Sequence, residues 1–336
     1  MKHRVFVLET GCAFEAGRDE TLLEAATRQG VQLPHECTLG GCGACRIRLA
    51  EGSVSYDEMP LALSEEEAQA GFALACQARA CGDLAISVPT AALPQAQRRS
   101  GVVRVLRQFT PDVLNLQLEL ESEPLEYLPG QYMNVLLPEG GHRSFSMASR
   151  PQGNRVDFHV RQVPGGRFTD GALRSLRAGD RLDVEIPLGG FRYHAQDYRP
   201  LLMVATGTGL APLKSMLEAL MDDADCPPVS LYWGMRTEAD LYLADEIRGW
   251  GERLYEFNFV PVLSRADAGW TGRRGHVQDA VEQDLPDLSD LSEHAVYLCG
   301  SPAMIADAKR RFLARGASAA HIYADGFSFQ HEEALA

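Results

Sequence analysis

Four cysteines give this chain of 336 residues its clearest chemical signal. Cys37, Cys42 and Cys45 lie close together, and Cys76 follows after a longer interval. The spacing, C-x4-C-x2-C with a distant fourth cysteine, is typical of a [2Fe–2S] cluster held by four thiolates. Structural zinc sites usually contain two short C-x2-4-C pairs, and unrelated buried thiols are the other alternative. The spacing favours the iron–sulfur cluster, and with it one-electron chemistry.

Glycines lie between the first three cysteines, at Gly40, Gly41 and Gly43. Glycine takes positive φ values without steric cost, so a tight loop of this composition can turn its N–H groups inward. The sulfur atoms of an anionic cluster accept hydrogen bonds from such donors, which help to set the reduction potential. The residues between the cysteines therefore agree with the spacing of the cysteines.

The segments around the cysteines predict a small domain of strands and helices. Residues 5–15 indicate a short hairpin. Helices are expected to begin after Thr21 and after Ser64, because each opens a capping box with a glutamate three positions later. Residues 46–49 and 86–88 alternate between apolar and polar side chains, as strands with one buried face do.

Composition sets limits on the class of protein. Hydrophobic residues make up 45% of the chain and charged residues 23%, which is ordinary for a globular protein of two or three domains. The net charge of −14 argues against a surface that binds nucleic acid or anionic membrane. Residues 1–90 contain seven basic and thirteen acidic side chains, a net charge of −6, which could steer a basic partner.

Targeting signals are not expected. The first residues lack the apolar stretch of a signal peptide, and no run of about 18 apolar residues predicts a membrane span. Eight cysteines in a chain of this size do not indicate a disulfide scaffold. We therefore expect a cytoplasmic protein, because thiolate ligands persist in a reducing compartment.

A second group of candidate residues follows a proline-containing linker, which we place at residues 93–100. Short alternating strands beyond it predict an antiparallel barrel. On one of these strands, Arg143 and Phe145 share a face, and Ser144 and Ser146 share the other. Alternation alone is a weak signal, since an ordinary strand would show it too.

Further along, Gly165 and Gly166 precede Thr169. A glycine turn that opens a helix presents free N–H groups and the positive end of the helix dipole, which together suit a phosphate group. A plain turn is the alternative for the two glycines. The phosphate interpretation is favoured because the motif follows the Arg143 strand at a suitable distance.

A third group lies at the ends of buried parallel strands. Residues 201–205 form a continuous apolar run that leads into Thr206-Gly207-Thr208-Gly209 and then into a helical pattern containing Pro212. A glycine turn between a strand and a helix can hold a diphosphate. The turn lacks the G-x-G-x-x-G pattern, so an ordinary dehydrogenase fold is disfavoured. Later strands end at Arg236, at Ser264-Arg265 and at Cys299-Gly300-Ser301-Pro302.

Together, these motifs resemble the ferredoxin–NAD(P) reductase superfamily, and within it the oxygenase reductases that carry an N-terminal plant-type [2Fe–2S] ferredoxin domain. Benzoate dioxygenase reductase and methane monooxygenase reductase are of this type. The C-terminal Tyr323-Ala324-Asp325 is similar to the ending of terephthalate dioxygenase reductases and of CDP-4-dehydro-6-deoxyglucose reductases.

The resemblance implies a multidomain fold. Residues 1–92 would form a β-grasp (α+β) ferredoxin domain, and residues 93–100 the linker. Residues 101–196 would form an antiparallel β-barrel that binds FAD. Residues 197–329 would form an α/β domain whose parallel sheet binds NAD(P), followed by a tail over residues 330–336.

The resemblance also implies roles for individual residues. Cys37, Cys42, Cys45 and Cys76 would be the cluster ligands. Ser146, Cys299 and Phe327 would be catalytic, with Ser146 near flavin N5, Cys299 near the reactive nicotinamide carbon, and Phe327 over the flavin face. Arg143 would hold the flavin diphosphate, and Phe145 would stack on the isoalloxazine, where the family usually has tyrosine. The flavin would be bound by Arg143, Ser144, Phe145, Ser146, His159, Val160, Arg161, Gly165, Gly166 and Thr169. The nicotinamide nucleotide would be bound by Thr206, Gly207, Thr208, Gly209, Pro212, Arg236, Ser264, Arg265, Gly300, Pro302 and Phe327.

The implied function is that of an NAD(P)H-dependent reductase. NADH would give a hydride to the flavin, which would release single electrons to the cluster and then to a terminal oxygenase, either a Rieske dioxygenase or a monooxygenase. NADPH is the alternative donor, because Arg236 and Arg265 could contact a 2′-phosphate. The alternative partner is a pyridoxamine-phosphate-dependent CDP-deoxysugar dehydratase, and a redox sensor without turnover is the competing class. The chain is expected to be monomeric on its own, with a linker that lets the ferredoxin domain dock first on the flavin domain and then on the partner.

Overall fold

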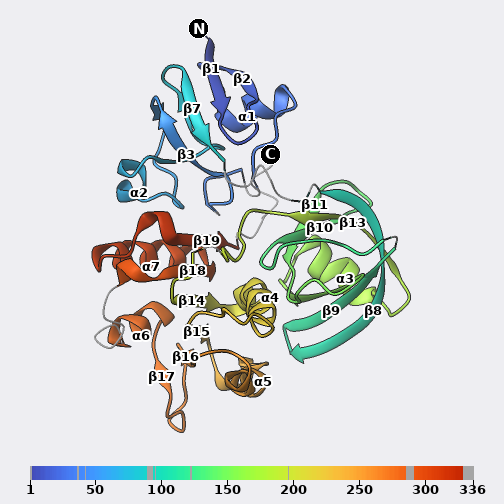
Figure 1. Cartoon of the computed structure of the whole chain (residues 1–336). Helices are drawn as coiled ribbons and strands as arrows, with labels where there is room; N and C mark the ends of the chain where they lie inside the picture. Colours follow the sequence, from blue (N-terminus) through green and yellow to red (C-terminus); the bar gives the residue numbers. More distant parts are fainter. Residues whose placement is uncertain are drawn as a thin grey trace.

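Three domains follow one another along the chain in the computed structural model (Figure 1). The structure describes residues 2–35, 38–41, 43–88, 94, 96–121, 123–195, 197–284 and 291–327. The predicted ligands Cys37 and Cys42 and the predicted tail at 330–336 lie outside these residues.

The first domain is a mixed five-stranded sheet that curves around one helix. Its strand order is β2-β1-β7-β3-β5, with β1 antiparallel to β2 and parallel to β7. This is the β-grasp arrangement that the sequence predicts. The elements are β1 Lys2–Val7, β2 Ala13–Gly17, α1 Leu22–Arg28, β3 Arg46–Glu51, β4 Val54–Ser55, α2 Glu65–Gln69, β5 Phe72–Leu74, β6 Arg79–Ala80 and β7 Leu84–Ser87.

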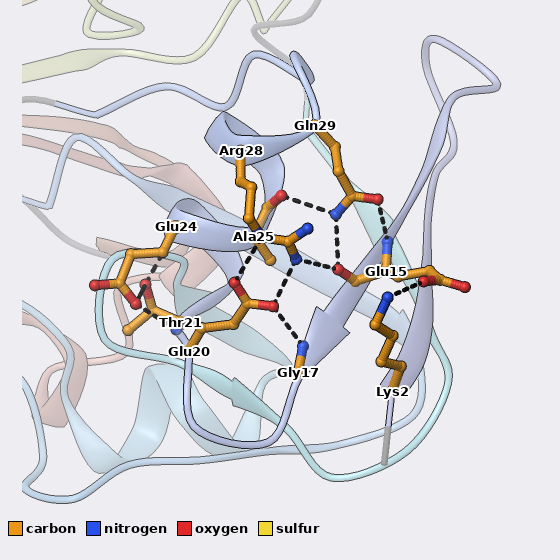
Figure 2. A network of polar contacts seen from close by, with 9 residues as sticks. All are labelled: Lys2, Glu15, Gly17, Glu20, Thr21, Glu24, Ala25, Arg28 and Gln29. Atoms are coloured by element: carbon orange, nitrogen blue, oxygen red, sulfur yellow. Dashed lines mark hydrogen bonds and ion pairs between the residues drawn. The ribbon is translucent and has the colours of Figure 1, made fainter.

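Both predicted capping boxes are formed. In the first, the Thr21 hydroxyl accepts from the Glu24 amide at 3.2 Å, and the Glu24 carboxylate accepts from the Thr21 amide at 2.8 Å. At the other end of α1, Arg28 donates to Glu20 and to the Glu15 carbonyl (Figure 2). These local contacts place α1 against β2 because both ends of the helix bind to the chain that precedes it.

The second domain is an antiparallel barrel of six strands in the order β11-β10-β13-β8-β9-β12. A bridge between Met147, directly after β11, and Phe158 of β12 brings the two edge strands together. Strand β8 begins at Gln97, so residues 97–100 of the predicted linker already belong to the barrel. The elements are β8 Gln97–Thr110, β9 Val113–Leu120, β10 Tyr132–Leu136, β11 His142–Ser146, β12 Arg155–Arg161, a π-helical turn Arg167–Ala172, α3 Leu173–Ser175 and β13 Arg181–Leu188.

The third domain is a parallel sheet in the order β17-β16-β15-β14-β18-β19. Helices α4 and α5 cover one face, and α6 and α7 cover the other. Its strands and α-helices are β14 Leu201–Thr206, α4 Leu210–Leu220, β15 Val229–Met235, α5 Ala244–Arg248, β16 Phe257–Leu263, β17 Arg273–Arg274, α6 Val277–Asp284, β18 Ala295–Gly300, α7 Pro302–Ala314 and β19 Ile322–Gly326. Short 3₁₀ turns span Gly207–Gly209, Glu238–Asp240, Gly249–Glu252, Leu291–Glu293 and Ala319–His321.

The parallel strands are buried on both faces, which explains their continuous apolar sequences. Leu202 and Val204 face the side of α6 and α7, whereas Leu201 and Met203 face the side of α4 and α5. In the part of the chain that the structure describes, no helix is long and apolar enough to cross a bilayer.

The first capping box gives a direct test of local folding. Thr21→Ala removes the hydroxyl that accepts the Glu24 amide, and we expect it to lower the free energy of unfolding of the first domain by about 1 kcal/mol. Urea unfolding followed by the visible absorption of the cysteine-bound cluster would measure the loss. Thr21→Ser keeps the acceptor and should stay close to wild type. Equal losses for both variants would contradict the account.

Candidate functional site

Two of the four predicted cluster ligands are described, and they lie together. The Cys45 and Cys76 sulfur atoms are 3.1 Å apart, and no disulfide joins them. Both residues are buried, at 2% and 5% exposure. Cys45 lies just before β3, and Cys76 lies in the turn after β5, so the sheet itself brings the two thiols into contact distance. Two adjacent buried thiols fit one half of a four-thiolate site.

The cluster loop needs glycine at two of the three predicted positions. Gly40 and Gly43 have φ values of +74° and +82°, whereas Gly41 is not in this left-handed region. A Cβ atom at Gly40 would lie 2.9 Å from Cβ of Pro60, so the loop 59–61 also packs directly against it. The cluster loop is therefore held by its close contact with Pro60 as well as by the strands.

The surroundings of the two thiols are dry. Burial raises the pKa of Tyr56 to about 12, and the nearby Cys45 and Cys76 act in the same direction. The Tyr56 hydroxyl accepts a hydrogen bond from the Leu74 amide at 3.1 Å, two residues before Cys76. A tyrosine that stays protonated here anchors the turn that carries the second ligand.

The predicted flavin strand is β11. Its partner is β10, with Ser144 opposite Asn134 and Ser146 opposite Tyr132. The Ser144 hydroxyl donates to the Asn134 side chain at 2.8 Å, whereas Ser146 is 7% exposed. Arg143 and Phe145 lie on the other face of the strand and are partly exposed, as the alternation predicts. This face offers a cation and an aromatic ring to a planar, negatively charged cofactor.

In the predicted phosphate loop of the barrel, one of the two glycines, Gly166, has no space for a side chain. A Cβ atom at Gly166 would lie 2.3 Å from the Thr169 hydroxyl, while Gly165 has a φ of +75° and open space around it. The Thr169 hydroxyl accepts the Val163 amide at 3.2 Å, which shapes the loop. Asp170 was not singled out from the sequence, yet its carboxylate accepts the Gly165 amide at 2.8 Å. The Gly165 N–H therefore already donates a hydrogen bond, to Asp170.

The turn after β14 is a close-packed cradle. A Cβ atom at Gly209 would lie 2.4 Å from the carbonyl oxygen of Cys299, and Gly207 has a φ of +58°. The indole N–H of Trp233 donates to the Gly207 carbonyl at 2.9 Å. Trp233 lies on the neighbouring strand β15 and is completely buried. No pattern in the sequence singles out Trp233, although its hydrogen bond orients the predicted diphosphate loop.

Two basic residues follow the ends of two adjacent strands. Arg236 follows β15, and Ser264 and Arg265 follow β16. The Arg265 amide donates to the Arg236 carbonyl at 2.8 Å, and all three side chains are exposed. The carboxyl ends of parallel strands are where nucleotides bind in open α/β sheets, so this pair suits a phosphate of the dinucleotide.

The end of β18 lies beside the β14 turn. Gly300 has a φ of +125°, and a Cβ atom there would lie 2.4 Å from the Thr206 hydroxyl. Phe327 donates its amide to the Gly300 carbonyl at 2.8 Å, and Pro302 begins α7. Cys299 is at the expected strand end, but its side chain is completely buried in the core beside α4. Its contact with nicotinamide therefore stays a prediction.

The predicted flavin residues at the end of β12 meet the third domain. Arg161 pairs with Asp112 at 3.0 Å, and its guanidinium lies 3.9 Å from the Cβ position of Gly207. Val160 is buried in the barrel core. The His159 ring forms a 3.1 Å hydrogen bond with the hydroxyl of Tyr242, a residue of the third domain. The His159 side chain thus lies at the interface between the barrel and the NAD-binding domain.

Comparison with known proteins covers all three domains. The family models that match are a 2Fe-2S iron-sulfur cluster binding domain at residues 5–81, an oxidoreductase FAD-binding domain at 103–193 and an oxidoreductase NAD-binding domain at 203–310. The chain is 33% identical over 323 residues to the CDP-6-deoxy-L-threo-D-glycero-4-hexulose-3-dehydrase reductase of Yersinia pestis, covering 95% of this chain and 96% of that protein.

A second relative is terephthalate 1,2-dioxygenase reductase component 2 of a Comamonas species, 32% identical over 335 residues and covering 98% of both chains. The chain belongs to the oxygenase reductase family. A solved member, a cytochrome P450 reductase from Amycolatopsis, is 33% identical, with a TM-score of 0.72 over 97% of this chain and 98% of that one.

Membership of the oxygenase reductases confirms the predicted cofactors, a [2Fe–2S] cluster, FAD and NAD(P)H, and the oxidoreductase class. It also confirms the predicted order of a ferredoxin domain, a FAD-binding domain and an NAD-binding domain. The roles of individual residues stay predictions.

The glycine cradle of the nucleotide loop can be tested by adding one methyl group. Gly209→Ala forces the loop away from the Cys299 carbonyl, and we expect the KM for NADH in ferricyanide reduction to rise on the order of tenfold. The flavin and cluster spectra should be unchanged. Gly251→Ala is the matched control in the same domain, because no atom lies within 4 Å of its Cβ position. An unchanged KM for Gly209→Ala would refute the assignment.

The His159–Tyr242 contact predicts a pH effect. Burial lowers the pKa of His159 from 6.5 to about 3, so below pH 6.5 the unfolded chain binds a proton that the folded chain refuses. The free energy of unfolding should therefore fall as the pH drops toward 3, by at most about 1.4 kcal/mol per pH unit from this group. Urea unfolding at several pH values would measure the slope. His159→Gln should reduce this slope, and an identical slope would contradict the prediction.

Proposed function

We propose that this reductase takes two electrons from NADH and delivers them one at a time to a separate protein, a terminal oxygenase. When bound, NADH would supply the hydride, FAD would take up its two electrons, and the cluster would release them singly. Plant-type ferredoxin clusters have reduction potentials near roughly −400 mV, which suits the cluster as the last carrier before the partner. The use of NAD(P)H, FAD and a [2Fe–2S] cluster is common to the family, whereas the terminal oxygenase as partner is our inference.

The observation that carries the proposal is an apolar surface at the cluster loop. Leu39, Met59 and Leu61 are 68%, 50% and 64% exposed. The loop 59–61 packs on Gly40, and the Ala62 amide donates to the Gly40 carbonyl at 3.0 Å. Three exposed large apolar side chains gathered beside a redox centre favour a protein that docks there, because such clusters on a surface mark interaction sites.

Charge around this apolar surface favours a basic rim on the partner. Asp57, Glu58, Glu65 and Glu66 are all exposed, close in sequence to the apolar residues. An acidic surface raises the rate of encounter with a basic one, and salt screens the effect. Transfer to the partner should therefore slow as ionic strength rises.

The chain's own residues have proposed roles around the cofactors. Arg143 and Phe145 would orient the flavin, and Ser146 would hold a hydrogen bond near its N5 atom. The Trp233-anchored turn and the Arg236–Arg265 pair would bind the dinucleotide. Phe327 would cover the flavin face until nicotinamide arrives, and Cys299 would line the same space. We favour NADH over NADPH on the family resemblance.

The alternative partner is a pyridoxamine-phosphate-dependent dehydratase that acts on a CDP-deoxysugar. The relative from Yersinia pestis, at 33% identity over nearly its whole length, supports this choice about as strongly as the dioxygenase relatives support theirs. Reconstitution with one purified partner of each type, supplied with NADH and substrate, would distinguish the two.

Substitution at the apolar surface tests delivery to a partner. Leu61→Glu should raise the KM for the accepting oxygenase on the order of tenfold, because a charge is then desolvated at the contact. NADH-driven ferricyanide reduction should be unchanged. Tyr255→Glu, at a 58% exposed position of the NAD-binding domain, is the matched control. If Leu61→Glu transfers electrons to the oxygenase as wild type does, the surface is not the docking site.

A further inference from the structure

A fully buried carboxylate joins the ferredoxin domain to the NAD-binding domain. Glu67 of α2 is 0% exposed, and Lys309 of α7 is 3% exposed. The Lys309 ammonium lies 3.2 Å from one Glu67 oxygen and 3.5 Å from the other. Arg46, at the start of β3, approaches the same carboxylate at 3.1 Å. Two cations from different domains thus share one anion away from water.

Other donors of this group bind backbone carbonyls across the domain interface, although the buried Nε atom of Arg46 has no hydrogen-bond partner among the residues that the structure describes. Arg46 donates to the carbonyl of Ile322 at 2.7 Å and to that of Ala319 at 2.6 Å, and both carbonyls belong to the NAD-binding domain. Lys309 donates in the other direction, to the Ala62 carbonyl at 3.2 Å. The Arg46 guanidinium also lies over the Phe72 ring, 3.8 Å from its centre. The contact is therefore reciprocal, and each side supplies donors that the other side accepts.

The carboxylate is fixed from within its own domain as well. Glu67 is the last residue of the Ser64 capping box, and one of its oxygens accepts the Ser64 amide at 2.9 Å. Its position is thus set by α2 before the domains meet. A buried charge that loses its partner costs several kcal/mol of free energy. Separating the domains at this interface would break the ion pair between Glu67 and Lys309, and water would have to replace those contacts.

The joint lies beside the cluster. Arg46 directly follows the ligand Cys45, and the Cβ position of Gly43 is 4.0 Å from the Ala324 carbonyl of β19. On the other side, the Tyr132 hydroxyl of the FAD-binding domain donates to the His35 carbonyl at 3.2 Å. In Figure 1, the ferredoxin domain sits above α7 and β19 with the barrel beside it. The cluster loop is therefore contacted by both other domains.

We propose that Arg46, Glu67 and Lys309 form an interdomain clamp that keeps the ferredoxin domain seated on the NAD-binding domain while the cluster is reduced. In this account, the ferredoxin domain does not leave the NAD-binding domain while the cluster is reduced. The expectation that the linker lets the domain dock first on the flavin domain and then on the partner stays a prediction, and it is the alternative to this proposal. The proposal rests on the family's flavin-to-cluster transfer and is independent of which partner accepts the electrons.

Glu67→Gln is the primary test variant. Glutamine keeps the shape and still completes a capping box, so α2 should remain intact, while the two buried cations lose their counter-charge. Lys309→Met is the second variant, which removes one cation and retains the length of the side chain. Glu24→Gln is the matched control, because it makes the same change in the other capping box of the same domain, where the side chain is exposed.

Hydrogen–deuterium exchange on the cofactor-loaded protein reports the clamp without turnover. We expect exchange in α2 and α7 to be at least about tenfold faster in Glu67→Gln and in Lys309→Met than in wild type. Glu24→Gln should match wild type in both helices. Unchanged exchange in α2 and α7 for Glu67→Gln and Lys309→Met would overturn the proposal.

Lengthening the linker distinguishes a ferredoxin domain that is clamped in place from one that is held by the linker alone. Inserting about 14 Gly and Ser residues within 89–95 triples its length, which lowers the effective concentration of a free tethered domain about fivefold. In anaerobic stopped-flow mixing with NADH, the insertion should change cluster reduction by less than about twofold in the wild-type protein. Combined with Glu67→Gln, it should slow cluster reduction about fivefold.

The opposite pattern would overturn the clamp. A fivefold slowing in the otherwise wild-type protein would mean that the domain moves freely on its linker. Ferricyanide reduction should be the same in every variant, which shows that NADH and flavin chemistry are intact. Loss of transfer to an oxygenase with normal cluster reduction would instead count against the proposed partner, so the two failures can be told apart.

Discussion

The Glu67 carboxylate is the interaction on which the arrangement of this reductase depends. It is shut off from water, and cations from two domains compensate its charge. Such a group contributes little net stability, because desolvation costs about as much as the ion pairs return. It helps to select the relative position of the two domains instead, because Glu67 pairs with both Arg46 and Lys309 only when the domains are placed in this way. That placement brings Gly43 of the cluster loop close to the Ala324 carbonyl of β19, and the His35 carbonyl into a hydrogen bond with Tyr132 of the barrel.

A different constraint shapes the predicted nucleotide site: the ends of two neighbouring strands lie so close together that only glycine fits between them. Gly209 and Gly300 each occupy positions where a Cβ atom would lie 2.4 Å from an oxygen atom of the neighbouring strand end. Strands β14 and β18 can therefore approach closely enough to form one continuous cradle with the Trp233-anchored turn. Arg161 of the barrel reaches this cradle, and His159 binds Tyr242 below it. The barrel and the NAD-binding domain thus meet beside the glycine turn after β14.

Local signals in the sequence predicted local structure well. The capping boxes at Thr21 and Ser64 form as expected, because every atom in them lies within four residues. The cysteine spacing predicted the cluster, and the glycine turn after β14 predicted a diphosphate site, for the same reason; the resemblance to the reductase family then implied the flavin. The clamp could not be found this way, since Glu67 and Lys309 are 242 positions apart and Glu67 already had a role as a cap. Trp233 and Asp170 were missed because their partners are backbone atoms, which leave no mark in a side-chain pattern.

The central claim is that electrons reach the cluster within one molecule whose domains stay together. The most direct measurement is anaerobic stopped-flow reduction of the cluster by saturating NADH over a wide range of protein concentrations. The account predicts a first-order rate constant that does not change with protein concentration. A rate that rises in proportion to protein concentration would show that flavin and cluster exchange electrons between molecules, and would contradict it.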